Sequence, residues 1–189
     1  MNKRWIPEIP QLLFQKNSAH LDERGTFAKF LDLDSTPLVE TFSSIAISKN
    51  PTQGTLRGLH FQDSSFAEEK AIMCISGSIY EVFVDLRRDE SSYGHWTHRI
   101  MDSNDLATAF VPKGIAHGFQ TLEENTWVLY GLTSVFNKEH AHRISYLDPT
   151  LAIEWPLLVS SISDADANGL TWDDCEKQKF VFKKNFEIE

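Results

Sequence analysis

Cysteine is scarce in this 189-residue sequence, which contains only Cys74 and Cys175, far apart along the chain. No CxxC motif and no cysteine/histidine spacing of a zinc site occurs. Cys74 lies in the apolar stretch "KAIMCISGSIYEVFV", which indicates a buried thiol kept in a reducing compartment. The cysteine pattern therefore excludes a zinc-finger type of protein and favours the cytoplasm.

Long hydrophobic runs are also missing. The N-terminus reads "MNKRWIPEIPQLLFQKN", with basic residues but only a short apolar run broken by proline. This is not the pattern of a secretory signal. No segment is long enough to span a bilayer, so we expect a cytoplasmic protein without membrane association.

Basic residues are outnumbered, because 18 Lys and Arg stand against 27 Asp and Glu, for a net charge of -9. This balance argues against a nucleic-acid-binding surface, which needs a basic stripe. Any anionic ligand has to be held by a local cluster of Arg and Lys, against the overall field. The hydrophobic share of 41% is enough for a sizeable core, and the length predicts one domain over residues 1–189.

The sequence is rich in strand-forming residues. The stretch "KAIMCISGSIYEVFVDLR" reads as two antiparallel strands joined by a tight Ser-Gly-Ser turn. The stretch "THRIMDSNDLATAFVPKGIAHGFQTLEENTWVLYGLTSVFN" repeats short β-rich runs between turn clusters. We predict an all-β barrel or sandwich. A short helix capped by Ser163 is expected near the C-terminus, after a loop in the proline-containing "LDPTLAIEWPL".

The stretch "GTLRGLHFQ" places two polar residues in a predicted strand. Strict alternation would direct Arg57 and His60 to opposite faces. A glycine inside a strand often marks a bulge, so distortion at Gly58 would let both side chains reach one cavity. His117, in "VPKGIAHGF", is a second histidine that could meet them there.

Plainer interpretations of these residues stay open. Each histidine alone is also consistent with a hydrogen-bonded core residue, and Arg57 with a surface ion pair. A metal site is disfavoured, because "RGLHFQ" supplies one histidine and no nearby carboxylate, whereas metal sites want three or more ligands in a compact set.

Four stretches, in their order and spacing, resemble the dTDP-4-dehydrorhamnose 3,5-epimerase family. They are "GTLRGLHFQ", "KAIMCISGSIYEVFVDLR", "FVPKGIAHGFQTLEENTWVLY" and "LDPTLAIEWPL" with the later "ISDADA". The resemblance begins earlier, at "LDERGTF" near residue 21, and ends at about Asp166. It implies a cupin-type jelly roll with short C-terminal helices. It also implies a homodimer that exchanges N-terminal strands, with neither a cofactor nor a metal.

The resemblance implies a catalytic set for removing a proton beside a ketone. It places the general base at His60, since an imidazole titrates near working pH, and its partner at Asp166. Lys70 matches a lysine beside the C4 oxygen, where it would stabilise an enolate. Tyr130 matches a tyrosine that delivers a proton to the opposite face. The alternatives are a core aromatic for Tyr130, a helix N-terminal residue for Asp166 and a solvated edge lysine for Lys70.

The resemblance further implies a substrate-binding set, which comprises Arg57, His117, Arg24, Phe27, Ser44 and Phe136. Arg24, in "DERGTF", matches an arginine that reaches the diphosphate from the partner subunit, and a guanidinium fork suits that anion.

This sequence departs from the family pattern at several of these positions. Where the family usually carries Gln and Asn before the "RGLHF" motif, this chain has Ser44 and Ala46. Phe136 stands where a tyrosine is common, and Glu81 where the acidic residue is usually shorter. Because the catalytic set is intact, we expect proton-transfer chemistry with a changed substrate or a changed centre of inversion.

The expected function is epimerisation of a nucleotide-diphosphate 4-keto-6-deoxy sugar at C3, C5 or both, for deoxysugar biosynthesis such as that of lipopolysaccharide O-antigen. One alternative is a 3,4-ketoisomerase, in which the same enolate is protonated elsewhere. Another is an inactive cupin that only binds a sugar nucleotide. The nucleotide itself, dTDP or CDP, is not specified by the sequence.

Overall fold

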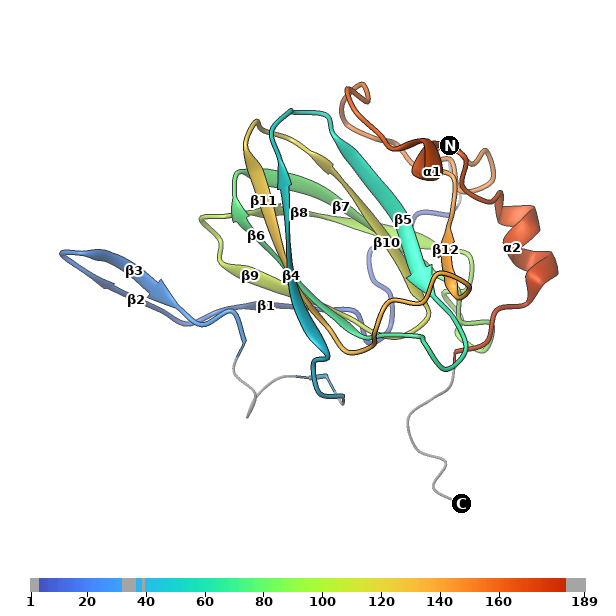
Figure 1. Cartoon of the computed structure of the whole chain (residues 1–189), viewed down its shortest axis with the longest axis horizontal. Coiled ribbons are helices and arrows are strands. Elements are labelled where there is room, and N and C mark those ends of the chain that lie inside the picture. The colour runs from blue at the N-terminus through green and yellow to red at the C-terminus, as the bar shows by residue number, and fades with distance from the viewer. Residues whose placement is uncertain (1–3, 32–36, 39, 183–189) are drawn as a thin grey trace, which may run out of the picture.

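The computed structural model describes residues 4–31, 37–38 and 40–182. Within these ranges the chain forms two five-stranded sheets, a two-stranded hairpin and two short helices (Figure 1). The predicted all-β sandwich with short C-terminal helices is therefore confirmed.

The first sheet is antiparallel throughout and has the order β1-β9-β6-β11-β4. Its strands are β1 (Leu13–Lys16), β9 (Ala107–Val111), β6 (Lys70–Ser76), β11 (Thr126–Leu132) and β4 (Ser44–Asn50). Within the sheet, β6 is a central strand, so Lys70 at its start is not an edge residue.

The second sheet is also antiparallel, with the order β12-β5-β10-β7-β8. Its strands are β12 (Ala141–Arg143), β5 (Leu56–Gln62), β10 (Ile115–Thr121), β7 (Ser78–Asp85) and β8 (Trp96–Asp102). All of β7 and β10 is buried, although these strands include polar residues such as Glu81 and His117.

Apolar side chains from both sheets form a shared core. Ile72 and Val128 of the first sheet belong to one buried cluster with Ile79, Phe83 and Phe119 of the second. Each of these side chains is at most 1% exposed. Two sheets that interdigitate their inner faces in this way hold the gap between them fixed.

The predicted hairpin at Ser-Gly-Ser is wrong. β6 and β7 follow each other with only Gly77 between them, yet β6 lies in the first sheet and β7 in the second. Gly77 has φ +73, and a Cβ there would lie 2.5 Å from Oγ1 of Thr126. One glycine in a left-handed conformation thus carries the chain from one sheet to the other, where a turn signal alone suggests that neighbouring strands pair.

A hairpin of β2 (Ala19–Asp22) and β3 (Gly25–Ala28) follows β1 and projects from the body of the molecule (Figure 1). Its side chains are almost all exposed, including those of Leu21 at 80% and Phe27 at 68%. β1 itself pairs with β9 of the same chain.

The C-terminal segment lies beside β5 and β12 and contains α1 (Asp164–Ala167) and α2 (Trp172–Gln178) (Figure 1). Ser163 caps α1, as predicted, and Thr171 caps α2 with a capping box. The proline-containing stretch before α1 forms no regular element, also as predicted. Neither helix, within the described ranges, is long and apolar enough to cross a membrane.

Candidate active site

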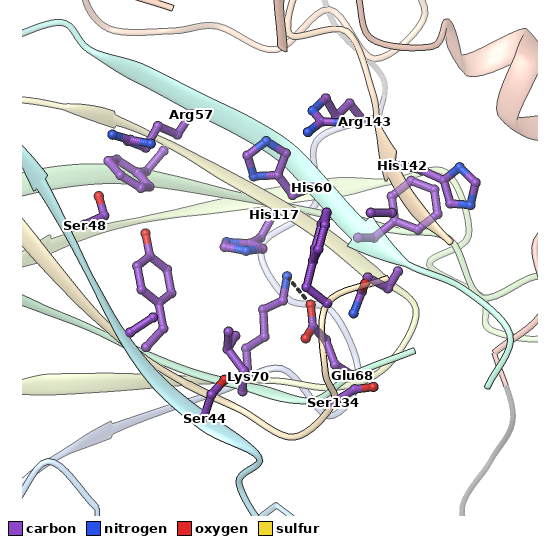
Figure 2. Close-up of a pocket in the computed structure, with 18 residues that line it drawn as sticks. Ser44, Ser48, Arg57, His60, Glu68, Lys70, His117, Ser134, His142 and Arg143 are labelled. Carbon is purple, nitrogen blue, oxygen red and sulfur yellow. Dashed lines mark ion pairs between the residues drawn. The ribbon is translucent and has the colours of Figure 1, made fainter. Parts of the chain in front are cut away.

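A cavity of about 380 Å³ is lined by residues of both sheets (Figure 2). The first sheet contributes through β4, β6 and β11, and the second through β5, β10 and β12. The polar side chains of its wall are those of Ser44, Ser48, Arg57, His60, Gln62, Glu68, Lys70, His117, Tyr130, Ser134, His142 and Arg143.

The bulge expected at Gly58 is present. Along the pairing of β5 with β10, His60 lies opposite His117 and Arg57 opposite Phe119, so three steps on β5 match two on β10. Gly58 has φ +119, and a Cβ there would lie 2.5 Å from the Cα of Gly118. The extra residue resets the alternation of the strand, and both Arg57 and His60 consequently line the cavity.

His60 is paired with a buried carboxylate. Its Nε2 lies 2.8 Å from Oδ1 of Asp166, whose side chain is only 7% exposed, whereas the imidazole is 38% exposed. Nδ1 of His60 has no hydrogen-bond partner in the described part of the chain. The carboxylate therefore fixes the ring through one nitrogen and leaves the other for a ligand.

Local structure holds Asp166 in place although 106 residues separate it from His60. Its backbone N–H donates to the Ser163 hydroxyl, while its Oδ2 accepts from the N–H of Gly58 at 3.3 Å. Burial raises the pKa of Asp166, but hydrogen bonds and the nearby charges of His60 and Arg143 outweigh it, so the pKa is lowered overall. The carboxylate stays ionised and can stabilise an imidazolium.

Tyr130 faces the same cavity from the first sheet. Burial raises the pKa of its phenol strongly and the charge of Glu81 adds to the shift, against a hydrogen bond with Ser48. The phenol is consequently a neutral proton donor. Base and donor stand on different sheets, with the cavity between them.

Lys70 lies deep in the site and is 5% exposed. Its Nζ pairs with Oε1 of Glu68 at 3.2 Å, and both side chains are nearly buried (Figure 2). This ion pair holds the ammonium in one place in the cavity wall, which is what a fixed electrostatic stabiliser requires.

His117 and Glu81 form a second imidazole–carboxyl pair. Nδ1 of His117 lies 2.7 Å from Oε1 of Glu81, and the two side chains are 7% and 0% exposed. Burial raises the pKa of Glu81 to about 8, and burial with the charges of Lys70 and His60 lowers that of His117. Both shifts favour a neutral pair, in which the protonated carboxyl donates to Nδ1. The remaining proton of His117 is then on Nε2, as a neutral hydrogen-bond donor.

The structure brings most of the sequence-predicted residues together. Ser44 and Ala46 line the cavity from alternate positions of β4, and Phe136 lines it while remaining 73% exposed. Arg24 and Phe27 lie instead on the projecting hairpin, where Arg24 pairs with Asp22. Neither residue is among those that line the cavity.

Sequence reasoning missed several residues of the wall, among them Ser48, Glu68, His142 and Arg143. Arg143 and Glu68 are charged residues in short polar stretches, which are typical of a solvated surface, so the sequence offered no signal for them.

Within the described ranges, no group of three or more His, Cys, Asp or Glu is arranged to hold a metal ion.

Comparison with known proteins gives a consistent family. Residues 7–174 match the family model described as dTDP-4-dehydrorhamnose 3,5-epimerase. The chain is 35% identical to the dTDP-4-dehydrorhamnose 3,5-epimerase of Mycobacterium tuberculosis over 161 residues, which covers 82% of this chain and 80% of that protein.

Solved structures agree with this match. A dTDP-4-dehydrorhamnose 3,5-epimerase from Bacillus anthracis, with TDP and PPi bound, has a TM-score of 0.82 at 32% identity, covering 85% of this chain and 94% of its own. A dTDP-6-deoxy-D-glucose-3,5-epimerase from Legionella pneumophila, in complex with dTDP-4-keto-L-rhamnose, has a TM-score of 0.86 at 28% identity, covering 94% and 96%.

Proposed function

This chain belongs to the dTDP-4-dehydrorhamnose 3,5-epimerase family, and we propose that it inverts C3, C5 or both of a nucleotide-linked 4-keto-6-deoxy sugar through an enolate. It is thus a sugar-nucleotide epimerase of the isomerase class. The observation that carries the proposed mechanism is the placement of the His60–Asp166 pair on one side of the cavity and Tyr130 on the other sheet.

The mechanism begins at His60. A hydrogen on a carbon beside the C4 ketone is acidic because its removal leaves an enolate. Nδ1 of His60 takes this proton, and the ionised Asp166, bonded to Nε2, stabilises the imidazolium that forms. The carboxylate does not need to accept the proton for this role.

The enolate oxygen requires donors that are already in position. Lys70, held by Glu68, supplies a positive charge in the cavity wall, and His117 supplies a neutral N–H. A preorganised donor at a developing oxyanion is worth roughly 3–4 kcal/mol of barrier height. Burial of both residues strengthens these interactions, because little water competes with them.

Inversion follows when the proton returns from the other side. Tyr130 approaches the cavity from the first sheet and His60 from the second. A proton delivered by the phenol therefore reaches the face of the sugar opposite to the one that His60 deprotonated. Arg57 lines the same wall, where its Nε is held by Oδ1 of Asn50 at 2.8 Å.

The proposal includes a homodimer in which the β2–β3 hairpin reaches the other subunit. Leu21 and Phe27 are large, exposed apolar side chains on that hairpin, which a second copy would cover. Arg24, exposed at the hairpin turn, would then lie near the partner's cavity. An exchanged N-terminal strand remains part of this proposal.

We also place the protein in the cytoplasm, in the biosynthesis of a deoxysugar for a glycan such as lipopolysaccharide O-antigen. The two free cysteines, Cys74 and Cys175, are both buried and unpaired with each other, which suits a reducing compartment.

The test is incubation in deuterium oxide with dTDP- and CDP-linked 4-keto-6-deoxyglucose, followed by mass analysis and NMR. An active epimerase incorporates deuterium at C3, C5 or both and changes the configuration there. His60→Ala should lower the exchange rate roughly a hundredfold to ten-thousandfold while dTDP still binds. Absence of deuterium at both carbons with either nucleotide would overturn the proposal, and a product with a moved carbonyl would indicate a ketoisomerase.

A further inference from the structure

The cavity wall carries three basic side chains, each held by a single side-chain contact. Nε of Arg57 donates to Asn50, Nζ of Lys70 pairs with Glu68, and Nε of Arg143 donates to Oδ1 of Asp166 at 3.1 Å. Lys70 already has a role in the proposed mechanism, and Arg57 belongs to the substrate-binding set that the sequence predicts. Arg143 has none, although it touches the catalytic pair directly.

Backbone pairing fixes the position of Arg143 relative to His60. In the antiparallel pairing of β12 with β5, Arg143 is the residue directly opposite His60. Directly opposed residues in such a pair have Cβ atoms about 4.5–5.5 Å apart on the same face of the sheet. Figure 2 accordingly shows Arg57, His60 and Arg143 along one side of the cavity, with Lys70 and Glu68 on the other.

The guanidinium of Arg143 has donors left over. Only its Nε is used, by Asp166, and within the described ranges Nη1 and Nη2 have no hydrogen-bond partner. The side chain is 38% exposed, whereas that of Asp166 is 7% exposed. A guanidinium that served only to neutralise Asp166 would gain most from a bidentate contact. Here one edge faces the carboxylate and the terminal nitrogens remain available.

The local charge favours an anion at this place. Among the residues lining the cavity, Arg57, Lys70 and Arg143 are positive and only Glu68 is acidic, in a chain of net charge -9. With the ionised Asp166 behind Arg143 included, positive side chains still outnumber negative ones. An anionic ligand would be repelled by the molecule as a whole, so its binding depends on such a local cluster. Planar guanidinium donors match phosphate oxygens in particular.

We propose that Arg143 is a further substrate-binding residue, whose terminal nitrogens bind a phosphate group of the nucleotide diphosphate while its Nε stays bonded to Asp166. This inference rests on the proposed function for the identity of the ligand. One residue then connects the anion of the substrate to the carboxylate that orients the base. The sugar ring is thereby held near His60 by its own diphosphate.

Binding measurements test this without any turnover. The affinities of dTDP and of inorganic pyrophosphate are measured by calorimetry for the wild type, Arg143→Gln, Arg143→Lys and Arg99→Gln. Arg143→Gln removes the charge and the paired nitrogen donors of the guanidinium, but its amide can still donate to Asp166. Arg143→Lys keeps the charge. Arg99, exposed on β8, is the matched control, because its replacement changes the net charge by the same amount.

The expected result is a loss of at least about tenfold in affinity for both probes with Arg143→Gln, which corresponds to about 1.4 kcal/mol. A smaller loss is expected with Arg143→Lys, and less than twofold with Arg99→Gln. In the deuterium assay, Arg143→Gln should raise KM more than it lowers kcat. Unchanged affinity of Arg143→Gln for both probes would overturn the proposal, as would a fall in kcat alone.

These outcomes remain distinct from a failure of the proposed function. If the wild type exchanges no deuterium but binds dTDP and pyrophosphate more tightly than Arg143→Gln, the phosphate-binding role of Arg143 stands and the epimerase activity does not. Circular dichroism and thermal unfolding of each variant show whether the fold is retained, and Arg143→Lys serves as the variant that preserves the charge at that position.

Discussion

Glu81 and His117 meet at 2.7 Å on the neighbouring strands β7 and β10, with both side chains buried. The contact is made by one carboxyl oxygen only, and Oε2 of Glu81 has no hydrogen-bond partner in the described part of the chain. An ionised carboxylate would leave a charged oxygen unsolvated there. The geometry and the raised pKa of Glu81, about 8, therefore agree on a protonated carboxyl.

This pair predicts a dependence of stability on pH. The pKa of Glu81 is about 8 in the folded protein against an ordinary value of 4.5, so the folded state binds this proton more tightly than the unfolded state. The stabilisation is complete below pH 4.5 and is lost as pH rises to about 8. The lowered pKa of His117 acts in the opposite direction, but only below about pH 6.5.

The pH range in which Glu81 changes the free energy of unfolding without an opposing contribution from His117 is consequently pH 6.5 to 8. Across it, the free energy of unfolding of the wild type should fall relative to that of Glu81→Gln, by up to about 1.4 kcal/mol per pH unit. Gln can still donate to Nδ1 of His117, so the variant keeps the contact without the titration. Urea unfolding at a series of pH values measures the free energy of unfolding of both proteins. If the two values change with pH by the same amount, the prediction is contradicted.

Tyr130→Phe should separate proton removal from inversion. His60 can still take a proton and return it to the same face, so solvent deuterium enters with retained configuration. Loss of the opposing donor should lower the rate of inversion by roughly a hundredfold or more. NMR of the product reports both deuterium content and configuration at each carbon. Equal losses of exchange and inversion would mean that the phenol acts on the first step.

Replacement of Lys70 should have two separable effects. Lys70→Met removes the charge near the enolate oxygen and should lower kcat by roughly a hundredfold to a thousandfold. It also leaves Glu68 nearly buried without its cation, at a cost of about 3–5 kcal/mol in stability. The double variant Lys70→Met with Glu68→Gln should regain much of the stability but none of the rate. Denaturant unfolding and the deuterium assay measure these quantities, and regained activity would place the catalytic role elsewhere.

Gly58→Ala tests the bulge that places Arg57 and His60 together. Gly25 is its matched control, because it has a similar φ of +122 but nothing within 4 Å of an added Cβ. Gly25→Ala should cost about 1–3 kcal/mol from backbone strain alone. Gly58→Ala should cost about 1–3 kcal/mol more, since its Cβ would meet Gly118. Similar losses of unfolding free energy in the two variants would show that the close approach is unimportant.

Much of this architecture could be predicted from local sequence patterns. Short apolar runs between turn residues indicated the sandwich, Ser163 indicated a helix start, and the glycine in "RGLHF" indicated a distorted strand. The resemblance to a family supplied Asp166 as the partner of His60, which spacing alone could not, because 106 residues separate them.

What the sequence could not predict depends on contacts between distant segments. The turn at Gly77 looks like a hairpin because sequence shows a local bend and not the sheet that each strand joins. Arg143 is opposite His60 only because β12 pairs with β5, and nothing in "HAHRIS" indicates that pairing. Protonation of Glu81 likewise follows from burial, which two neighbouring strands create together.

The proposed base, His60, and the proposed acid, Tyr130, come from different sheets. The hydrophobic core that separates the sheets therefore also affects the stereochemistry of the proposed reaction. Ile72, Val128, Phe83 and Phe119 pack between the sheets, and Tyr130 packs against the same cluster. These side chains act as a spacer whose thickness sets the gap that a sugar ring must fit. A substitution that narrows this gap should therefore change the ratio of inverted to retained configuration at the reacting carbon, as well as the stability of the fold.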